Sequence, residues 1–271
     1  MSDEQVVLYE VKEGVALITL NRPERLNAWN GAIEVGYFDR LEEASLDADV
    51  KVIVLTGAGR GFCAGADMDL LQGIGQAGGA GEQGPRRPPT FPLTVPKPII
   101  AAINGACAGI GFVHALMCDL RFAAAGAKFT MAFARRGLVA EHGASWLLPR
   151  LVGQANALDI LMSSRVFLAE EARELGVVNR VVPPEQLMDE TMAYAADLAA
   201  NCSPASMAAM KKQVYRHVAS DLTTAMEESN VLMAESLRQP DFKEGVASFV
   251  DKRPPQFAPL SIKPGEATSV T

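Results

Sequence analysis

The sequence is poor in the residues that bind transition metals and build disulfide frameworks. It has three histidines and four cysteines among 271 residues. No C-x-x-C pair and no histidine at zinc-ligand spacing accompanies the widely separated cysteines, which are Cys63, Cys107, Cys118 and Cys202. We therefore expect free, mostly buried thiols in a reducing compartment, and neither a metal site nor a disulfide scaffold.

Targeting signals and several common catalytic motifs are also missing. The N-terminal residues 1–5 are acidic and lack the basic and then apolar form of a signal peptide. There is no Walker A, H-E-x-x-H or EF-hand sequence, and Gly57-x-Gly59 lacks the third glycine of a dinucleotide fingerprint. The missing signal peptide predicts a cytoplasmic protein. The missing motifs indicate that any catalytic chemistry does not depend on these common sequence signatures.

An excess of positive charge is absent as well. Twenty-five Lys and Arg stand against 32 Asp and Glu, for a net charge of −7. Phosphates would repel such a chain at long range, which argues against nucleic-acid or anionic-membrane partners. A phosphorylated small molecule remains possible because it needs only a few local cations. The apolar stretch 99–120 contains Asn104, His114, Asp119 and three glycines, so it predicts a buried strand, turn and helix and not a membrane span.

What the chain does have is apolar residues, 49% of the total, enough for a large folded core. Their periodicity predicts an α/β body and a C-terminal helical section. We expect a loop over the Gly- and Pro-rich residues 73–90 and a helix beginning near Gly109. The predicted strands are 6–11, 15–20, 51–56, 99–103, 121–125, 128–131 and 177–182, and the other predicted helices are 32–48, 169–175, 185–200, 204–219 and 221–238.

Two segments of small residues, 61–67 and 104–111, each follow a buried strand and lead into a predicted helix. Such backbone can approach a ligand closely and turn N–H groups toward an anion or an oxyanion. Tight strand–helix packing without any ligand is the alternative for either segment alone. Two such turns in one chain favour a pair of converging donors.

A resemblance to a known family is carried by the segments 20–23, 26–28, 59–67, 104–111, 136–139, 169–172, 175–178 and 248–253. The chain resembles the crotonase family, also called the enoyl-CoA hydratase/isomerase family, over about residues 6–257. The resemblance implies a spiral of β-β-α turns over residues 1–200, which would hold an acyl-CoA site. Residues 201–271 would form a helical region that builds a homotrimer or a dimer of trimers. It implies no cofactor beyond the coenzyme A of the substrate.

By the same resemblance, the N–H groups of Ala66 and Ile110 would hold the thioester oxygen and stabilise an enolate. Ile110 replaces the glycine usual in the family and is expected to narrow the pocket. Family hydratases use two glutamates. The matching positions here are Val113 and Phe133, whose side chains can neither accept nor donate a proton. Ordinary two-glutamate hydration is therefore not expected.

Glu141 lies where several family isomerases have their single catalytic carboxylate. One carboxylate suffices to take a proton from C2 of a 3-enoyl-CoA and return it at C4. We expect an apolar wall of Val113, Phe133 and Trp146 to raise the pKa of Glu141 and exclude water. A structural acid at a helix N-terminus is the alternative reading of Glu141, and His142 either assists it or is structural.

The resemblance also implies residues near the coenzyme A and the acyl group. Asp67 fits a helix cap that borders this site, whereas ordinary surface charges are the alternative for Arg25 and Lys252. His114 is expected in the core and His217 on a solvated helix face. The full substrate-binding set is Arg25, Asn27, Ala28, Ala64, Asp67, Met68, Gly109, Val113, Phe133 and Trp146, with Phe249 and Lys252 supplied by a neighbouring subunit.

The leading hypothesis is thus an isomerase that converts 3-enoyl-CoA to 2-enoyl-CoA in fatty acid or related acyl-CoA metabolism. Hydration by Glu141 alone, or another acyl-CoA reaction such as ring isomerisation, is the second. A non-catalytic acyl-CoA binder is the third. The acidic balance places an RNA-binding role last.

Overall fold

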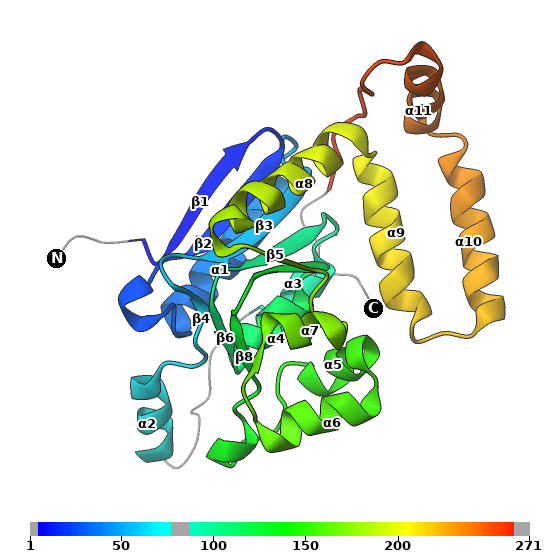
Figure 1. Ribbon diagram of the computed structural model, residues 1–271. Coiled ribbons are helices and arrows are strands. Elements are labelled where there is room, and N and C mark those ends of the chain that lie inside the picture. The colour runs from blue at the N-terminus through cyan, green and yellow to red at the C-terminus, as the bar shows by residue number, and fades with distance from the viewer. Residues whose placement is uncertain (1–4, 77–86, 263–271) are drawn as a thin grey trace.

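Two sheets form the body of the protein, and the computed structural model describes residues 5–76 and 87–262. The larger sheet has six strands in the order β1-β2-β3-β5-β7-β10 (Figure 1). Only its first pair is antiparallel, joined by a tight turn in which Glu13 and Gly14 both have positive φ. The strands are β1 (Val7–Lys12), β2 (Val15–Leu20), β3 (Val52–Gly57), β5 (Ile99–Ile103), β7 (Leu120–Ala124) and β10 (Arg180–Val182).

The smaller sheet has the order β4-β6-β8-β9 and consists of short strands. Its first three strands are parallel, and β9 closes it antiparallel to β8. The strands are β4 (Gly61–Cys63), β6 (Ala106–Ala108), β8 (Lys128–Thr130) and β9 (Phe167–Leu168).

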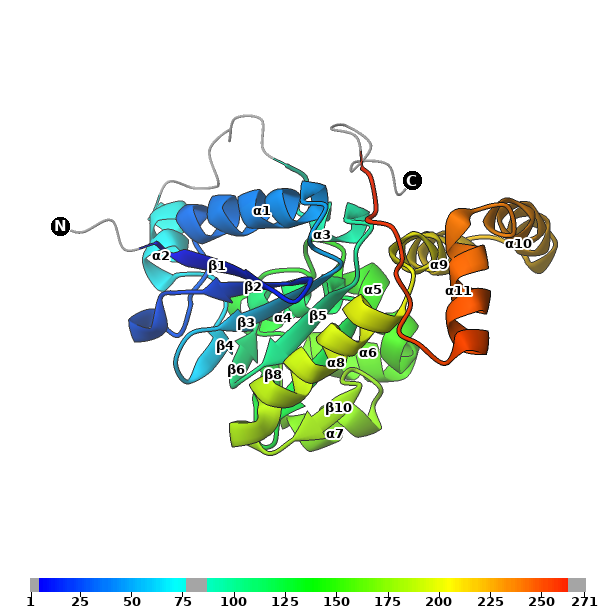
Figure 2. The same ribbon diagram turned by 90° about the horizontal axis from the view of Figure 1, so that it is seen from above.

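Helices cover both faces of the larger sheet, with α1 on one side and α8 on the other (Figure 2). Short 3₁₀ turns lie at Pro23–Arg25, Ala134–Arg136 and Pro184–Gln186. The helices are α1 (Gly31–Leu46), α2 (Met68–Gln76), α3 (Phe91–Thr94), α4 (Ile110–Met117), α5 (Ala144–Val152), α6 (Gln154–Ser163), α7 (Ala169–Glu174), α8 (Leu187–Asn201), α9 (Pro204–His217), α10 (Leu222–Ser236) and α11 (Pro240–Asp251).

The chain repeats one pattern as it builds the body. A strand of the larger sheet is followed by a strand of the smaller sheet and then by a helix, as in β3-β4-α2 and β5-β6-α4. In the third turn, β7 and β8 are followed by the 3₁₀ turn Ala134–Arg136 and α5. This is the predicted spiral of β-β-α turns. It places the segments after β4, after β6 and after β8 next to one another.

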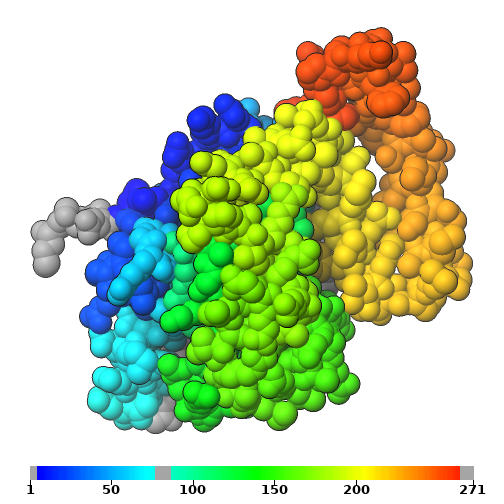
Figure 3. Space-filling view, in the orientation of Figure 1, coloured from blue at the N-terminus to red at the C-terminus, as the bar shows by residue number. Residues whose placement is uncertain are grey.

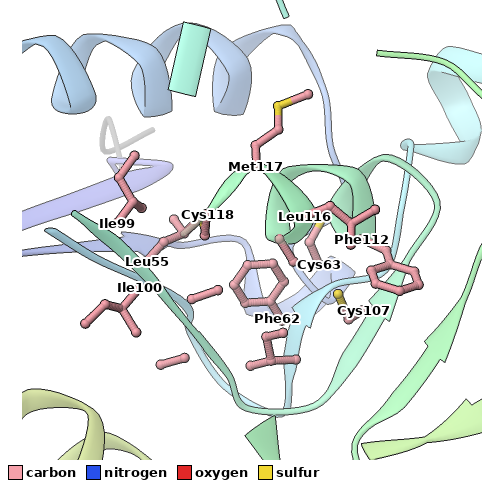
Figure 4. Close-up of a cluster of buried hydrophobic side chains, with 14 of the residues drawn as sticks. Leu55, Phe62, Cys63, Ile99, Ile100, Cys107, Phe112, Leu116, Met117 and Cys118 are labelled. Atoms are coloured by element: carbon pink, nitrogen blue, oxygen red, sulfur yellow. The ribbon is translucent and has the colours of Figure 1, made fainter. Parts of the chain in front are cut away.

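The core lies between the larger sheet and α4, where Leu55, Phe62, Ile100, Phe112 and Leu116 pack together (Figure 4). Every residue of α4 is buried. That burial explains why the stretch 99–120 is so apolar, and it confirms the predicted strand, turn and helix. In the described ranges, no helix is long and apolar enough to cross a membrane. The prediction of free thiols is also confirmed: three of the four are buried and Cys202 is partly so.

Some predicted elements differ from the structure. The strand expected over 177–182 begins only at Arg180, because the N–H groups of Val177 and Val178 both donate to the Ala172 carbonyl at the end of α7. Residues 73–76, expected in a loop, are the last turn of α2. Residues 77–86 of that expected loop lie outside the described residues. Helices α6 and α11 were not predicted.

Helices α9 to α11 extend from the body as an arm (Figures 1 and 3). Asp119 attaches α9 to the body, since its carboxylate accepts hydrogen bonds from Lys211 Nζ at 2.7 Å and from Tyr215 Oη at 3.0 Å. Helix α10 packs on α9 through Glu228, which accepts from Arg216 and lies 3.1 Å from His217 Nε2. His217, the last residue of α9, is therefore partly buried against α10 and does not lie on a fully solvated face as expected.

Candidate active site

A cavity of about 340 Å³ lies where the three β-β-α turns meet. It brings together the three residues predicted to be catalytic, Ala66, Ile110 and Glu141. Among the predicted substrate-binding residues, Ala64, Gly109 and Phe133 also line it. The other lining residues are Gly65, Leu71, Ile74, Ala108, Thr130, Ala132, Arg136 and Leu138.

The backbone of Trp29 fixes the orientation of Ala66. Trp29 N–H donates to the Gly65 carbonyl at 2.7 Å, and its own carbonyl accepts from Asp67 N–H at 2.8 Å. Because Trp29 bonds to the two residues that flank Ala66, the N–H of Ala66 points away from Trp29. In the described part of the chain, no group accepts a hydrogen bond from the N–H of Ala66. It is therefore available to a ligand.

Ile110 is the first residue of α4, so its N–H has no acceptor within the helix. Gly109 precedes it with φ of +49° and ψ of −124°, and donates to the Thr130 carbonyl at 2.9 Å. This turn aims the start of α4 at the cavity. Among the described residues, none accepts a hydrogen bond from the N–H of Ile110. The positive end of the helix dipole also favours negative charge at this point.

Glu141 lies just before α5 and is the only carboxylate among the described residues that line the cavity. The following residue, His142, has φ of +50°, and its Nε2 is 3.5 Å from Glu141 Oε2. The Glu141 side chain is 44% exposed. The carboxylate therefore faces both the cavity and solvent.

The apolar wall expected around Glu141 is only partly present. Phe133 lines the cavity, but Val113 does not, since it is fully buried inside α4. Trp146 lies elsewhere, with the Arg150 guanidinium 3.8 Å above its ring. Val113 and Trp146 are not part of this wall, because α4 turns Val113 into the core and α5 turns Trp146 toward the arm side of the body.

Asn27 is structural and does not line the cavity. Its side chain is fully buried, and its amide donates to the carbonyls of Ala58 and Gly61 while its Oδ1 accepts from Arg22 N–H. The two bonds from the amide hold the turn between β3 and β4, and the third ties Asn27 to its own segment at Arg22. The Asn27 side chain does not reach the cavity, so a contact between it and the substrate stays a prediction without support from this geometry.

Arg22 is a residue that the sequence reasoning missed. Its guanidinium donates to Asp67 Oδ2 at 2.9 Å and to the Ala28 carbonyl at 2.8 Å. The bond from Arg22 holds the pKa of Asp67 below its usual value. Asp67 also accepts from Asp69 N–H at the start of α2, which confirms the predicted helix cap. Arg22 therefore holds Asp67 in place next to Ala66. Its position in segment 20–23, which resembles the family, could have pointed to this role.

Leu71 and Ile74 were also missed, although they line the cavity. They are three residues apart on α2 and so share one face of the helix. The expectation of a loop beginning at residue 73 hid this spacing.

Nine of the twelve predicted binding residues lie outside the cavity in this chain, and these nine include the exposed residues Arg25, Met68, Phe249 and Lys252. Met68 is 52% exposed at the start of α2, and the exposed Arg25 is paired with Asp69 at 3.4 Å. Phe249 is 85% exposed on α11, and Lys252 follows that helix. Figures 1 and 2 place α11 and α2 at opposite ends of the molecule, so the chain does not bring Phe249 and Lys252 to its own cavity.

A spiral of β-β-α turns that ends in one cavity with two main-chain donors and a carboxylate defines an enzyme of the crotonase class. The sequence profile of the enoyl-CoA hydratase/isomerase family matches residues 10–259. The chain belongs to this family.

The names of similar proteins include both an isomerase and a probable hydratase. The chain is similar to the 1,2-epoxyphenylacetyl-CoA isomerase of Escherichia coli K12, at 36% identity over 93% of this chain and 98% of the relative. It is 39% identical to a probable enoyl-CoA hydratase of Rhodobacter capsulatus, over 93% of this chain and 97% of that one.

Solved structures agree with the fold. The crystal structure of an enoyl-CoA hydratase from Mycobacterium marinum is 54% identical, with a TM-score of 0.68, and covers 78% of this chain and 98% of its own. A probable enoyl-CoA hydratase/isomerase from Mycobacterium abscessus is 29% identical with a TM-score of 0.87, over 94% and 99% of the two chains.

Proposed function

We propose that the protein moves the double bond of a 3-enoyl-CoA to position 2, in fatty acid or related acyl-CoA metabolism. The observation that carries this proposal is the meeting of one carboxylate, Glu141, with the two unpaired N–H groups of Ala66 and Ile110 in a single cavity. This set matches a proton shuttle at a carbon next to a thioester.

In the proposed reaction, the N–H groups of Ala66 and Ile110 form an oxyanion hole for the thioester oxygen. Glu141 removes a proton from C2, and the electron pair of the C–H bond spreads into a dienolate held by the two donors. The same carboxyl then returns the proton to C4, so the substrate and the product have the same atoms. One oxyanion-hole donor typically contributes about 2.7–4 kcal/mol to lowering such a barrier.

Glu141→Gln tests the proton shuttle. The amide cannot take a proton, so we expect turnover of 3-enoyl-CoA to fall by at least two orders of magnitude, in line with general acid–base catalysis. Binding of a saturated acyl-CoA should be retained. Glu174→Gln, an exposed position on α7, is the matched control and should keep full activity. Full isomerase activity in Glu141→Gln would refute the assignment.

Ile110→Pro tests the second donor directly. Proline is tolerated at the first position of a helix, so this variant removes the N–H with little cost to α4. We expect its kcat to fall about 10²- to 10³-fold. Ile110→Ala shortens the side chain and keeps the N–H, so it should retain most of that activity. Equal kcat values for the two variants would contradict the oxyanion hole.

Hydration by Glu141 is the second candidate. Its support is the partial exposure of Glu141 to solvent and the relatives named as hydratases. Incubation of the enzyme with 2-enoyl-CoA in heavy-oxygen water separates the two reactions. Label in a 3-hydroxyacyl product supports hydration, and its absence removes that candidate. A third thioester to test as a substrate is 1,2-epoxyphenylacetyl-CoA, the compound in the name of one relative.

We also propose that the arm is covered by other copies of the chain in a homotrimer or a dimer of trimers. The arm exposes large apolar side chains, which monomers rarely leave in one region. Phe249 and Lys252 would then reach the nucleotide end of the coenzyme A bound to a neighbouring chain. The division of the chain near residue 200 stays a prediction tied to this assembly. The exposed apolar residues of α9 to α11 include Met210, Val214, Val218, Leu222, Met226, Val231, Met233, Phe242, Val246, Phe249 and Val250.

Light scattering tests the assembly, since a trimer has three times the 28.9 kDa mass of one chain. Phe249→Glu places a charge on the most exposed apolar residue of the arm. We expect it to weaken assembly and raise KM for acyl-CoA. Leu8→Glu, on β1 and away from the arm, is the control. A monomeric wild-type protein with full activity would overturn the proposal.

A further inference from the structure

We propose that the stacked rings of Trp29 and His114 set the spacing between the two N–H donors of Ala66 and Ile110. This inference rests on the proposed oxyanion hole and gives these two residues a positioning role. Neither ring lines the cavity among the described residues. They act through the backbone to which each ring is attached.

Trp29 holds the segment that carries the first donor, the N–H of Ala66. Its N–H and carbonyl hold Gly65 and Asp67, so any movement of the Trp29 backbone moves Ala66 as well. Trp29 is 3% exposed and is thus enclosed by protein. Its side chain is the part of this segment that reaches toward α4.

His114 is on the helix that carries the second donor, the N–H of Ile110. It lies four residues after Ile110, one turn further along α4, and is 2% exposed. Because a helix turn is stiff, the position of the His114 ring fixes the start of α4 and with it the Ile110 N–H.

The two rings join these segments. Their centroids are 4.0 Å apart and their planes differ by 17°, which is a stacked contact. The edge of His114 also meets Tyr37 of α1, with centroids 5.6 Å apart at 83°. Tyr37 in turn contacts Trp29 edge-on at 5.8 Å. The three rings form one packed unit, which connects the segment of Ala66 with the helix of Ile110.

A neutral imidazole suits this position. Burial, with a smaller effect from the charge of His142, lowers the pKa of His114 to about 3. Its Nδ1 is buried without a hydrogen-bond partner in the described chain. The ring therefore serves as a flat packing surface, and no hydrogen bond from Nδ1 explains its placement.

Variants at His114 separate this role from simple stability. His114→Leu removes the stack, whereas His114→Phe keeps a flat ring. Phe112→Leu is the matched control: Phe112 is fully buried on the same helix, and its ring meets Phe129 at 5.3 Å, on the far side from Trp29. Thermal unfolding reports the stability of each variant.

The readout is the stretching frequency of the thioester carbonyl in bound butyryl-CoA labelled with carbon-13, together with kcat and KM for 3-enoyl-CoA. A working oxyanion hole lowers this frequency relative to water. For His114→Leu we expect a smaller carbonyl shift, a 10- to 100-fold lower kcat and little change in KM, as a displacement of about 1 Å can cause. His114→Phe should restore the shift and most of the kcat, and Phe112→Leu should keep both.

A full carbonyl shift and full kcat in His114→Leu would overturn the inference, and so would a His114→Phe variant as impaired as His114→Leu. Loss of the shift in Phe112→Leu would also overturn it, since any loosening of α4 would then suffice. If the wild-type protein binds butyryl-CoA without a carbonyl shift, the oxyanion hole itself is wrong. That result is distinct from a failure of the stack.

Discussion

His114 makes the stability of the fold depend on pH, and the size of the effect follows from its burial. Its pKa is about 3 in the folded chain, against 6.5 for the exposed group. Between these values the unfolded chain binds a proton that the folded chain does not, so stability falls as the pH falls from 6.5 toward 3. With 1.36 kcal/mol per pKa unit, His114 alone removes about 2 kcal/mol between pH 7 and pH 5.

Urea unfolding of the wild type and of His114→Phe at a series of pH values between 7.5 and 4.5 measures this term. Phenylalanine keeps the stacked ring but does not titrate, so groups common to both proteins cancel in the difference. The protein concentration must be equal in all samples, because any assembly adds to apparent stability. We expect the two stabilities to diverge by about 2 kcal/mol on going from pH 7 to pH 5. Parallel curves would refute the reasoning.

Three further outcomes follow from individual contacts. Asn27→Ala removes three hydrogen bonds to the main chain, one of them buried and two partly buried, and should cost about 2–3 kcal/mol in urea unfolding; an unchanged midpoint would contradict its structural role. Gly111→Ala places a Cβ 2.6 Å from Cys63 Cβ and should destabilise the protein by about 1–3 kcal/mol, whereas Gly75→Ala, whose Cβ would meet no atom of the described residues within 4 Å, should not. Ile110→Gly keeps the N–H but empties part of the cavity, so relative kcat/KM should move toward bulkier acyl groups across a thioester panel. An unchanged acyl preference would show that the Ile110 side chain does not limit the substrate.

Periodicity and small-residue turns predicted the body of the fold well. The strands 15–20 and 99–103 agree with β2 and β5 residue for residue, because continuous apolar runs bounded by turns are typical of parallel strands covered on both faces. The strand at 177–182 was too long because hydrogen bonds from its first residues to the end of α7 depend on tertiary packing. Composition alone marked residues 73–76 as loop, whereas Leu71 and Ile74 face the cavity from that helix.

The site was predictable where the chemistry lies in the backbone or in a single acid. Ala66, Ile110 and Glu141 share one cavity as expected. Side-chain directions were harder to predict. Val113 is three residues after Ile110 and Asn27 is two residues before Trp29, which holds the Ala66 turn, yet both are fully buried in the core. Sequence spacing does not contain that information without the packing of neighbouring elements.

The two main-chain donors have a consequence for how such a protein can diverge. An N–H group is present in every residue except proline, so almost any mutation at positions 66 and 110 leaves the electrophilic part of the site intact. If these groups polarise the thioester carbonyl as proposed, selection can alter the acids and the acyl pocket separately from them. In the proposed reaction the main-chain donors and the acid are therefore separate requirements, so the loss of a carboxylate would leave the anchor for the thioester in place.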